Sequence, residues 1–298
     1  MKKVIILAVL FLMGQTSWAQ IRDFQTTRLN STAGAGVASI LSTEAALLNP
    51  AASAFFEGSS FSYQSYTTEL KKVSPERDTL NDPFQKNNRA QGLFMADHSG
   101  PVKGGAAYIN QNENGYDRDR MALHGAVPMS ASSSLGVSYN YIQDRLPAKH
   151  KDRHQTHHQL SMGTVHILDE KTIIGLVLLD PTKTVQGNER LIGGFQYNVA
   201  ERFMLIGDIG TQYTKNVKKK YLWRVAAQIN IFSDFFFRAG KFYDNVSNFE
   251  GTGWGAGWIG PRFGVEFAQK FSEHIGDRNY LYKGESLVDT SLSAIIKF

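Results

Sequence analysis

The chain has 298 residues, a formal net charge of +5, 20% charged residues and no cysteine. The lack of cysteine excludes disulfide bonds and thiolate chemistry. The small positive charge is not gathered into a basic cluster of the kind that nucleic-acid-binding proteins use, so no nucleic-acid partner is expected. After the N-terminus no segment approaches about eighteen consecutive apolar residues, so no transmembrane helix is predicted.

The N-terminus has the pattern of a secretory signal. Two lysines, Lys2 and Lys3, precede an apolar run over 4–13, and Ser17 and Ala19 place small residues just before Gln20. This pattern predicts a cleaved signal peptide over 1–19. A run of about ten residues is too short to span a bilayer as a helix. A lipoprotein signal, the alternative, would require a cysteine at the cleavage point.

The segment that follows, 20–57, is rich in small residues and reads "GAGVASILSTEAALLNPAASAFF" over 34–56. Ser42 can cap a short helix that has Glu44 in its first turn. Pro50 is expected to end that helix, because the residue before a proline disfavours helical geometry. Glycine and alanine allow close backbone packing in a confined space. We therefore predict a compact hatch, or plug, over 20–57.

From residue 58 onward the chain reads as short strands that alternate between apolar and small or polar residues. Leu135, Val137 and Tyr139, for example, alternate with Gly136 and Ser138. This period of two, with little charge on the second face, is typical of a membrane β-barrel; a soluble β-sandwich would carry more charge there. The predicted strands are 58–68, 90–97, 103–112, 119–127, 133–144, 157–167, 172–180, 189–198, 202–213, 219–230, 235–244, 251–259, 262–271 and 288–298.

The links between these strands alternate in length. Long polar links follow several odd-numbered strands, at 69–89, 146–156, 181–188 and 272–287. Tight links follow even-numbered strands, at 98–101, 168–171, 198–201 and 259–262. Bacterial outer-membrane barrels have an even number of strands, short periplasmic turns and long outer loops. The sequence thus predicts an all-β fold, an antiparallel barrel of about fourteen strands over 58–298, with both termini in the periplasm.

The C-terminal stretch "SLSAIIKF", over 291–298, places Leu292, Ala294, Ile296 and Phe298 on one face. An alternating last strand that ends in an aromatic residue is similar to the sorting signal of outer-membrane barrels, so Phe298 is the predicted signal residue and the barrel assembly machinery a predicted partner. The alternative is an ordinary edge strand that happens to end the chain.

The histidines of the chain could indicate a metal site or a catalytic centre. Four histidines lie close together, at His150, His154, His157 and His158. Imidazoles bind zinc or copper, but the basic residues at 149, 151 and 153 would repel a cation, so an outer loop without metal is the prediction. His124 lies in "MALHGAV", which contains no nucleophile elbow. We therefore predict neither catalysis nor a cofactor.

Charged residues on the presumed inner faces of strands are Asp208, Arg224 and Glu266. Inside a polar lumen we expect them to pair with each other or with the plug. The basic link over 215–220 could contact lipopolysaccharide phosphate, although a solvated loop is the simpler interpretation.

The plug segment resembles the N-terminal hatch of FadL-type long-chain fatty acid transporters, in which a Gly/Ala-rich lead-in and an Asn-Pro-Ala motif precede a fourteen-stranded barrel. PorV-like relatives, which serve in type IX secretion, share this lead-in. A second stretch, 253–268, is similar to the penultimate hairpin of the same superfamily. The matching residues of the lead-in are Gly34, Gly36, Ala38, Ala45, Ala46, Asn49, Pro50 and Ala51.

The resemblance implies a function. It implies passive uptake of hydrophobic small molecules, such as long-chain fatty acids, across the outer membrane of a Gram-negative bacterium, with Gly34, Gly36, Asn49, Pro50 and Ala51 gating passage. Membrane lipids and lipopolysaccharide are then the expected surroundings. The chain is shorter than those transporters and has little sequence for their long outer loops. Two alternatives therefore stay open, a barrel that docks a protein partner and a structural barrel with a blocked lumen.

Overall fold

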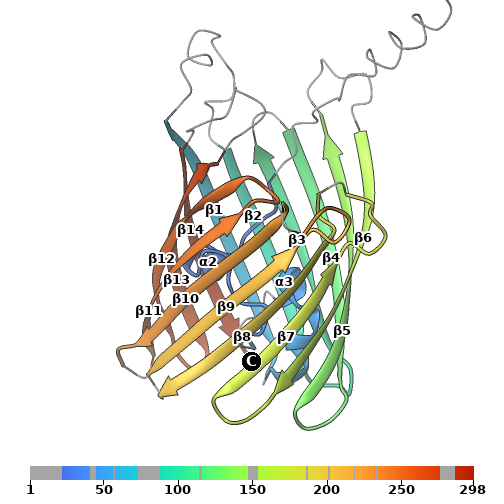
Figure 1. The fold of residues 1–298 in the computed structure, drawn as a ribbon. Coiled ribbons are helices and arrows are strands. Elements are labelled where there is room, and N and C mark those ends of the chain that lie inside the picture. Colours follow the sequence, from blue (N-terminus) through green and yellow to red (C-terminus); the bar gives the residue numbers. More distant parts are fainter. Residues whose placement is uncertain are drawn as a thin grey trace, which may run out of the picture.

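The computed structural model describes residues 22–40, 45–56, 58–72, 88–113, 116–146, 154–185, 187–200, 202–217, 219–232, 234–275 and 286–298. The predicted signal over 1–19, Ser42, Glu44 and His150 lie outside these ranges. The described residues form fourteen antiparallel strands that close into one barrel (Figure 1). The prediction of an antiparallel barrel of about fourteen strands is confirmed.

All fourteen strands lie where the alternation placed them, with ends that differ by a few residues. β10 to β12, for example, begin and end within two residues of the predicted bounds. The strands are β1 Ser60–Lys72, β2 Asn88–Asp97, β3 Lys103–Glu113, β4 Tyr116–Pro128, β5 Ser133–Arg145, β6 His154–Ile167, β7 Thr172–Leu179, β8 Arg190–Ala200, β9 Phe203–Thr211, β10 Tyr221–Asn230, β11 Phe235–Asp244, β12 Phe249–Ile259, β13 Phe263–His274 and β14 Ser286–Lys297.

Each strand pairs with its neighbours in sequence, and the first pairs with the last. β1 and β14 run in register from Ser60 opposite Lys297 to Leu70 opposite Leu287. Two backbone bonds between Ser59 and Phe298 extend this seam beyond the strands. Because a closed barrel leaves no unpaired strand edge, all backbone groups of the wall can be satisfied within it.

The two faces of the wall differ in chemistry as predicted. The outward face carries large apolar side chains that are exposed, among them Met95, Leu123, Leu135, Val137, Val225 and Ile229. The inward face carries buried polar side chains, among them Gln64, Gln111, Ser138, Asn140, Gln196 and Gln228. This arrangement suits an apolar surrounding outside and a polar lumen inside.

The links sort by length with two exceptions. The links after even-numbered strands have five residues or fewer, whereas those over 73–87, 146–153, 180–189, 212–220 and 275–285 are longer. The links over 114–115 and 245–248 break the pattern. The predicted histidine loop is partly wrong, because His154, His157 and His158 belong to β6. The polar stretch extends β6 toward the end of the barrel that carries the long links, where the outer surface of the strand does not have to be apolar.

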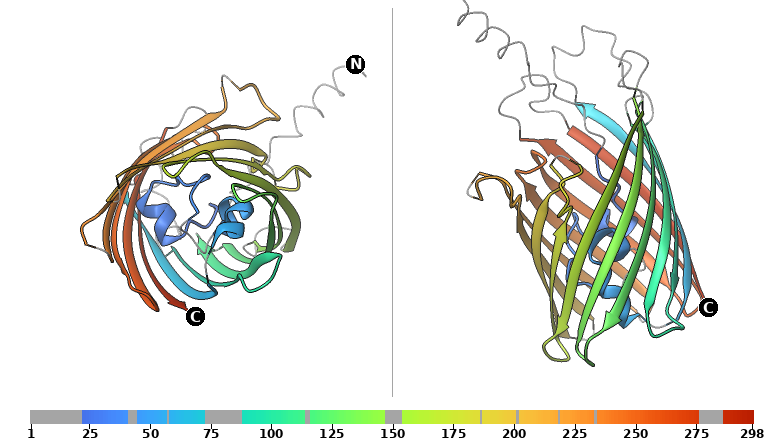
Figure 2. Two further views of the ribbon diagram at one scale, coloured as in Figure 1. Left: turned by 90° about the horizontal axis from the view of Figure 1, so that it is seen from below. Right: turned by 90° about the vertical axis from the view of Figure 1, so that its right-hand side faces the viewer.

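The N-terminal segment, residues 22–56 where described, lies inside the barrel (Figure 2). It contains α2 (Thr27–Ser31), α3 (Ala45–Leu48) and a 3-10 helix, η1 (Pro50–Phe55). α2 contacts β11 to β14 and β1, while η1 contacts β3 to β6. The predicted stop before Pro50 is confirmed, but Pro50 also starts the next helix, because proline suits the first helical position. No helix among the described residues has the length and apolarity needed to cross a membrane.

Candidate functional site: the luminal segment and its cavity

Inward-facing glycines of the wall make room for the luminal segment (residues 22–56, where described). At seven of them an added Cβ would come within 3.0 Å of atoms of that segment. At Gly136, for instance, it would collide with the backbone of Pro50 and Ala51. The seven are Gly136, Gly163, Gly175, Gly194, Gly240, Gly253 and Gly255. The wall is therefore shaped to the backbone of the segment that it encloses.

Two of the three predicted luminal charges hold the segment directly. The carboxylate of Asp208 accepts hydrogen bonds from the amides of Gly36, at 2.9 Å, and Val37, at 3.2 Å. On the neighbouring strand, Arg224 donates to the carbonyl oxygen of Gly34 at 3.0 Å. Gly34 has a φ of 88°, which favours glycine, and an added Cβ there would lie 3.3 Å from the Arg224 side chain. Together these bonds fix the turn that follows α2.

Asn49 joins three parts of the structure. Its Nδ2 donates to the carbonyl oxygens of Val37, at 2.8 Å, and Thr164 of β6, at 3.2 Å. Its Oδ1 accepts from the amide of Ala51 at 3.2 Å, which makes Asn49 the N-cap of η1. The carbonyl oxygen of Ala51 in turn accepts a bond from Ser134 of β5. The Asn-Pro-Ala motif is thus a structural joint between two parts of the segment and the wall.

The other end of the segment is held by Arg22. Its guanidinium bonds Glu113 at 2.7 Å, both carboxylate oxygens of Asp289 at 3.1 and 3.2 Å, and Thr68 at 2.9 Å. Burial alone would lower the pKa of Arg22. The negative charges of Asp289 and Glu113 raise this pKa by more, so the net shift is upward and the guanidinium stays charged. Glu113 ends β3 and Asp289 lies near the start of β14, so Arg22 lies toward the end of the barrel opposite Phe298. No motif of the sequence pointed to this residue.

The third predicted charge, Glu266, pairs within the wall. It accepts a hydrogen bond from Arg238 of β11 at 3.0 Å, and the same guanidinium donates to Gln228 of β10. Arg238 is 2% exposed and lies over the ring of Phe236. The expectation that the luminal charges pair with each other or with the plug describes Asp208 and Arg224; Glu266 has a wall partner that the strand pattern alone did not identify.

A cavity of about 350 Å³ lies between the luminal segment and the wall. Five cationic side chains line it, those of Arg22, Arg120, Arg190, Arg224 and Lys270. Three carboxylates line it as well, those of Asp23, Asp244 and Asp289. Arg190 pairs with Asp244 at 2.9 Å, and Arg224 approaches the same carboxylate at 3.8 Å. The cavity therefore carries charges of both signs, and Glu113, which pairs with Arg22, adds a further carboxylate beside it.

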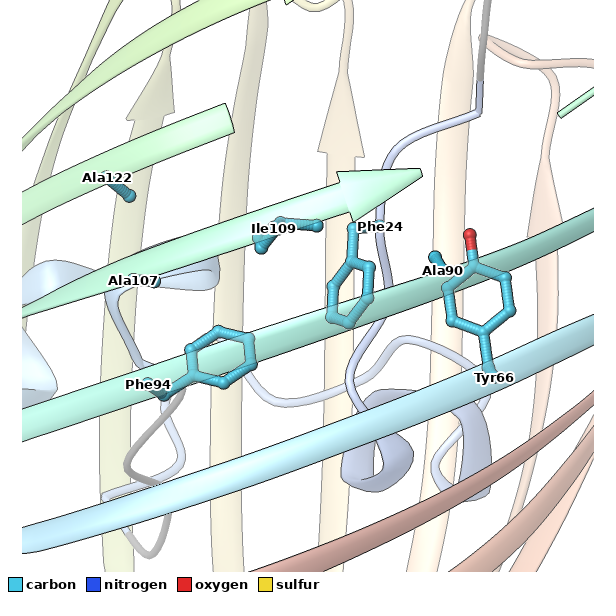
Figure 3. Close-up of a cluster of buried hydrophobic side chains, with 7 residues drawn as sticks. All are labelled: Phe24, Tyr66, Ala90, Phe94, Ala107, Ile109 and Ala122. Atoms are coloured by element: carbon cyan, nitrogen blue, oxygen red, sulfur yellow. The ribbon is translucent and has the colours of Figure 1, made fainter. Parts of the chain in front are cut away.

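Apolar groups lie at two sides of the same cavity. On one side Phe24 of the luminal segment packs against Tyr66 and Phe94, with ring centroids 5.3 and 6.0 Å away (Figure 3). Leu47 packs on this cluster. On another side Leu48, Leu179 and Val246 pack on the cluster formed by Val37, Val177, Ile192 and Leu222. A ligand in the cavity would thus meet both rings and charges.

Within the described ranges, no three or more His, Cys, Asp or Glu residues are grouped so that they could hold a metal ion. His158 lies on the outer face between Tyr139 and Tyr141, with ring centroids 6.0 and 5.5 Å away. His124 is buried on the inner face beside Gly105, on the same face of β4 as Ala122 and Ala126.

Comparisons with known proteins identify solved structures that have a similar fold. No protein-family model and no curated protein matches the sequence. Among solved structures, the CymD monoaromatic hydrocarbon channel matches with a TM-score of 0.69 at 13% identity, over 92% of this chain and 97% of that one. The toluene transporter TbuX of Ralstonia pickettii matches with 0.67 at 12%, over 92% and 98%. A FadL homologue of Pseudomonas aeruginosa matches with 0.61 at 12%, over 93% and 99%.

The chain therefore has the fold of the FadL-type barrels. The resemblance that was expected from the Gly/Ala-rich lead-in and the strand count is confirmed at this level, because the match covers nearly the whole length of both chains. Sequence identities of 12 to 13% establish a shared fold alone.

Proposed function

We propose that the protein is an outer-membrane channel for passive uptake of small molecules with hydrophobic bodies. The observation that carries this proposal is the cavity between the luminal segment and the wall, lined by Phe24, Tyr66, Leu47 and Leu48, in a barrel of FadL type. Neighbours in fold include a monoaromatic hydrocarbon channel and toluene transporters. The apolar outer face of the barrel supports a place in the outer membrane.

The cavity volume bears on the size of the ligand. Small-molecule sites commonly measure about 300–1,000 Å³, and 350 Å³ lies near the lower end of that range. A compact molecule such as a single aromatic ring or a short chain therefore suits the cavity better than a long-chain fatty acid does.

Native mass spectrometry of the detergent-purified protein, with solvent extraction run in parallel, tests the proposal. We expect a bound small molecule with an apolar body at near-stoichiometric amounts. A barrel that carries a co-purifying protein instead would favour the second candidate, a barrel that docks a protein partner. The many hydrogen bonds that fix the luminal segment support this second candidate, because a fixed plug transports less readily.

The gating role is tested by deleting residues 20–50. The chain from Ala51 onward retains the barrel strands, and loss of the plug opens a lumen too wide for wall side chains to fill. We expect a folded barrel that admits small polar solutes in a liposome-swelling assay. Permeability equal to that of the intact chain would contradict a plug. The heat-induced shift of the barrel on a denaturing gel verifies folding of both proteins.

A further inference from the structure

Lys241 is a cation on the outer face of the wall that has no partner in the described part of the chain. It lies on β11, its side chain is exposed, and it forms no ion pair with any described carboxylate. Opposite it on β10 lies Val225, an exposed apolar residue of the same face. A lysine on the lipid-facing side of a barrel is costly at the bilayer centre and less so near the interface, toward which its long side chain extends.

Three rings beside Lys241 indicate the level of the membrane interface. Tyr243, the next outward residue of β11, lies opposite Trp223 of β10, and their nearly parallel rings have centroids 6.3 Å apart. Tyr221 stacks on Tyr243 with centroids 5.5 Å apart. Tyrosine and tryptophan gather where a membrane meets water, because each has an apolar ring and a polar tip. Lys241 therefore lies one outward position from this level, toward the apolar band.

Two further lysines lie on the other side of these rings, in the long link over 212–220 that leads into β10. Lys215 and Lys219 are both exposed, and neither forms an ion pair within the described ranges. The link is fixed to the turn after β11. Lys220 donates to the carbonyl oxygen of Asn245 at 2.7 Å, and the Asn245 side chain donates to the carbonyl oxygen of Lys219 at 2.9 Å. The two exposed lysines are thus presented from a fixed backbone.

Carboxylates also lie on this outer surface. Glu250 of β12 is opposite Tyr243 and diagonal to Lys241, and Glu273 of β13 is directly opposite Glu250. Neither carboxylate forms an ion pair with a described residue. Like charges that face each other across paired strands repel, and a divalent cation between them would remove the repulsion. The surface therefore suits a phosphate in two ways, directly at the lysines and through a bridging Mg²⁺ at the glutamates.

We propose that the outer face of β10 to β13 binds a phosphoglycolipid of the lipid A type, with Lys215, Lys219 and Lys241 on its phosphates. Charge-assisted bonds from an ammonium to phosphate oxygens are stronger than neutral ones. The long-link end is the outer end expected of a bacterial barrel, and the lysines lie on both sides of its ring level. A headgroup with two phosphates spans that distance better than the single phosphate of a phospholipid does, while the acyl chains lie along the apolar wall. The surface is outside the barrel, so this inference goes beyond uptake and does not depend on it.

Native mass spectrometry of the delipidated full-length barrel, titrated in detergent with Mg²⁺ present, tests the proposal. The probes are bisphosphorylated lipid A and phosphatidylglycerol. We expect lipid A to bind at least about tenfold more tightly, because it offers two phosphates to charged donors. Lys241→Gln should weaken lipid A binding about fivefold, and its combination with Lys215→Gln and Lys219→Gln should weaken it by more than tenfold. Lys171→Gln is the matched control, since it removes an exposed lysine from a tight link at the other end of the barrel.

Two results would overturn the proposal. Equal affinity for the two lipids would show a general attraction of anionic lipids, and unchanged lipid A affinity in the folded triple variant would place the lipid elsewhere on the wall. The bridging cation has its own test. EDTA should lower the lipid A affinity of the parent chain but not that of a Glu250→Gln, Glu273→Gln variant; a parent chain that does not respond to EDTA would overturn the bridge. The heat-induced gel shift verifies folding of every variant.

Discussion

At the scale of single residues, the lumen is held together by charge-assisted bonds to backbone groups. Asp208 binds two consecutive amides of the luminal segment, and Arg224, on the paired strand, binds a carbonyl oxygen two residues earlier. Both side chains are more than nine-tenths buried. Removal of either side chain would leave buried backbone groups without a hydrogen-bond partner. Each unsatisfied group lowers the stability of the folded state.

Replacement of Asp208 by alanine tests this anchor. A hydrogen bond to a charged group contributes about 1.5–3 kcal/mol, so the amides of Gly36 and Val37 should exchange with solvent at least about tenfold faster. Hydrogen–deuterium exchange of the peptide over 34–40 measures this. Asp208→Asn retains an acceptor and should show a smaller change. Glu266→Gln, which removes only a charge that pairs within the wall, should show none; equal effects in all three variants would argue against the anchor.

At the scale of elements, the strands and the luminal segment are complementary in shape. Glycines on the inner faces of β5, β7, β8, β11 and β12 meet the backbone of the segment, and the glycine of β6 meets the side chain of Asn49. Glycine in a strand interior lowers strand stability, so its presence at these positions reflects close approach of another backbone. The joint at Asn49 connects η1 to β6 and to Val37.

The substitution Gly136→Ala tests the fit. Its Cβ would collide with the backbone of Pro50 and Ala51, which cannot move without displacing η1. We expect a lower temperature for the barrel's gel-mobility transition and leakage of small solutes in liposomes. Gly125→Ala on the neighbouring strand is the matched control, since its Cβ would have its nearest contact at 3.6 Å, with Val102. If the two variants behaved alike, crowding of η1 would not be the cause.

The last strand provides a prediction about assembly. Phe298 is 78% exposed, and its contribution to the seam is made by backbone bonds to Ser59. Phe298→Ala should therefore refold in vitro as the parent chain does, while the amount of folded barrel in the outer membrane falls several-fold. Comparison of heat-modifiable protein in membrane fractions with refolding in detergent measures both. Normal levels in the membrane would show that Phe298 is not a sorting signal.

At the scale of the whole molecule, the barrel is apolar outside and polar inside. Leu123, with 60% of its surface exposed, lies near the centre of β4, and Val127 lies near the end of the same strand. Both side chains point outward, so they report on the same surface at two depths. A membrane around the barrel would make the cost of a charge depend on that depth.

Arginine at these two positions measures the surrounding medium. Leu123→Arg should lower the free energy of unfolding in lipid vesicles by about 2–4 kcal/mol, and Val127→Arg by about 0–1 kcal/mol. Denaturant titration followed by tryptophan fluorescence gives both values. Equal costs at the two positions would place the apolar band elsewhere on the wall.

The sequence alone predicted the wall well and the lumen poorly. Period-two alternation located β11 with the bounds later observed, because one face of each strand must be apolar. It missed the start of β6 at His154, where the strand leaves the apolar band. Arg22, Arg120 and Lys270 were not singled out, since they share a cavity only after closure of the barrel brings β4 and β13 around the segment. The side of the membrane that each terminus faces stays a prediction.

The seam between Ser59 and Phe298 has a consequence for the order of folding. The luminal segment precedes β1 in the chain, whereas β14, which completes the wall, is made last. A closed wall whose glycines fit one particular backbone offers no room for a bulky chain to thread in afterwards. The segment therefore has to be seated while the wall is still an open sheet, and the final pairing of β1 with β14 seals it inside. In this order of folding the luminal segment is a template around which the strands close.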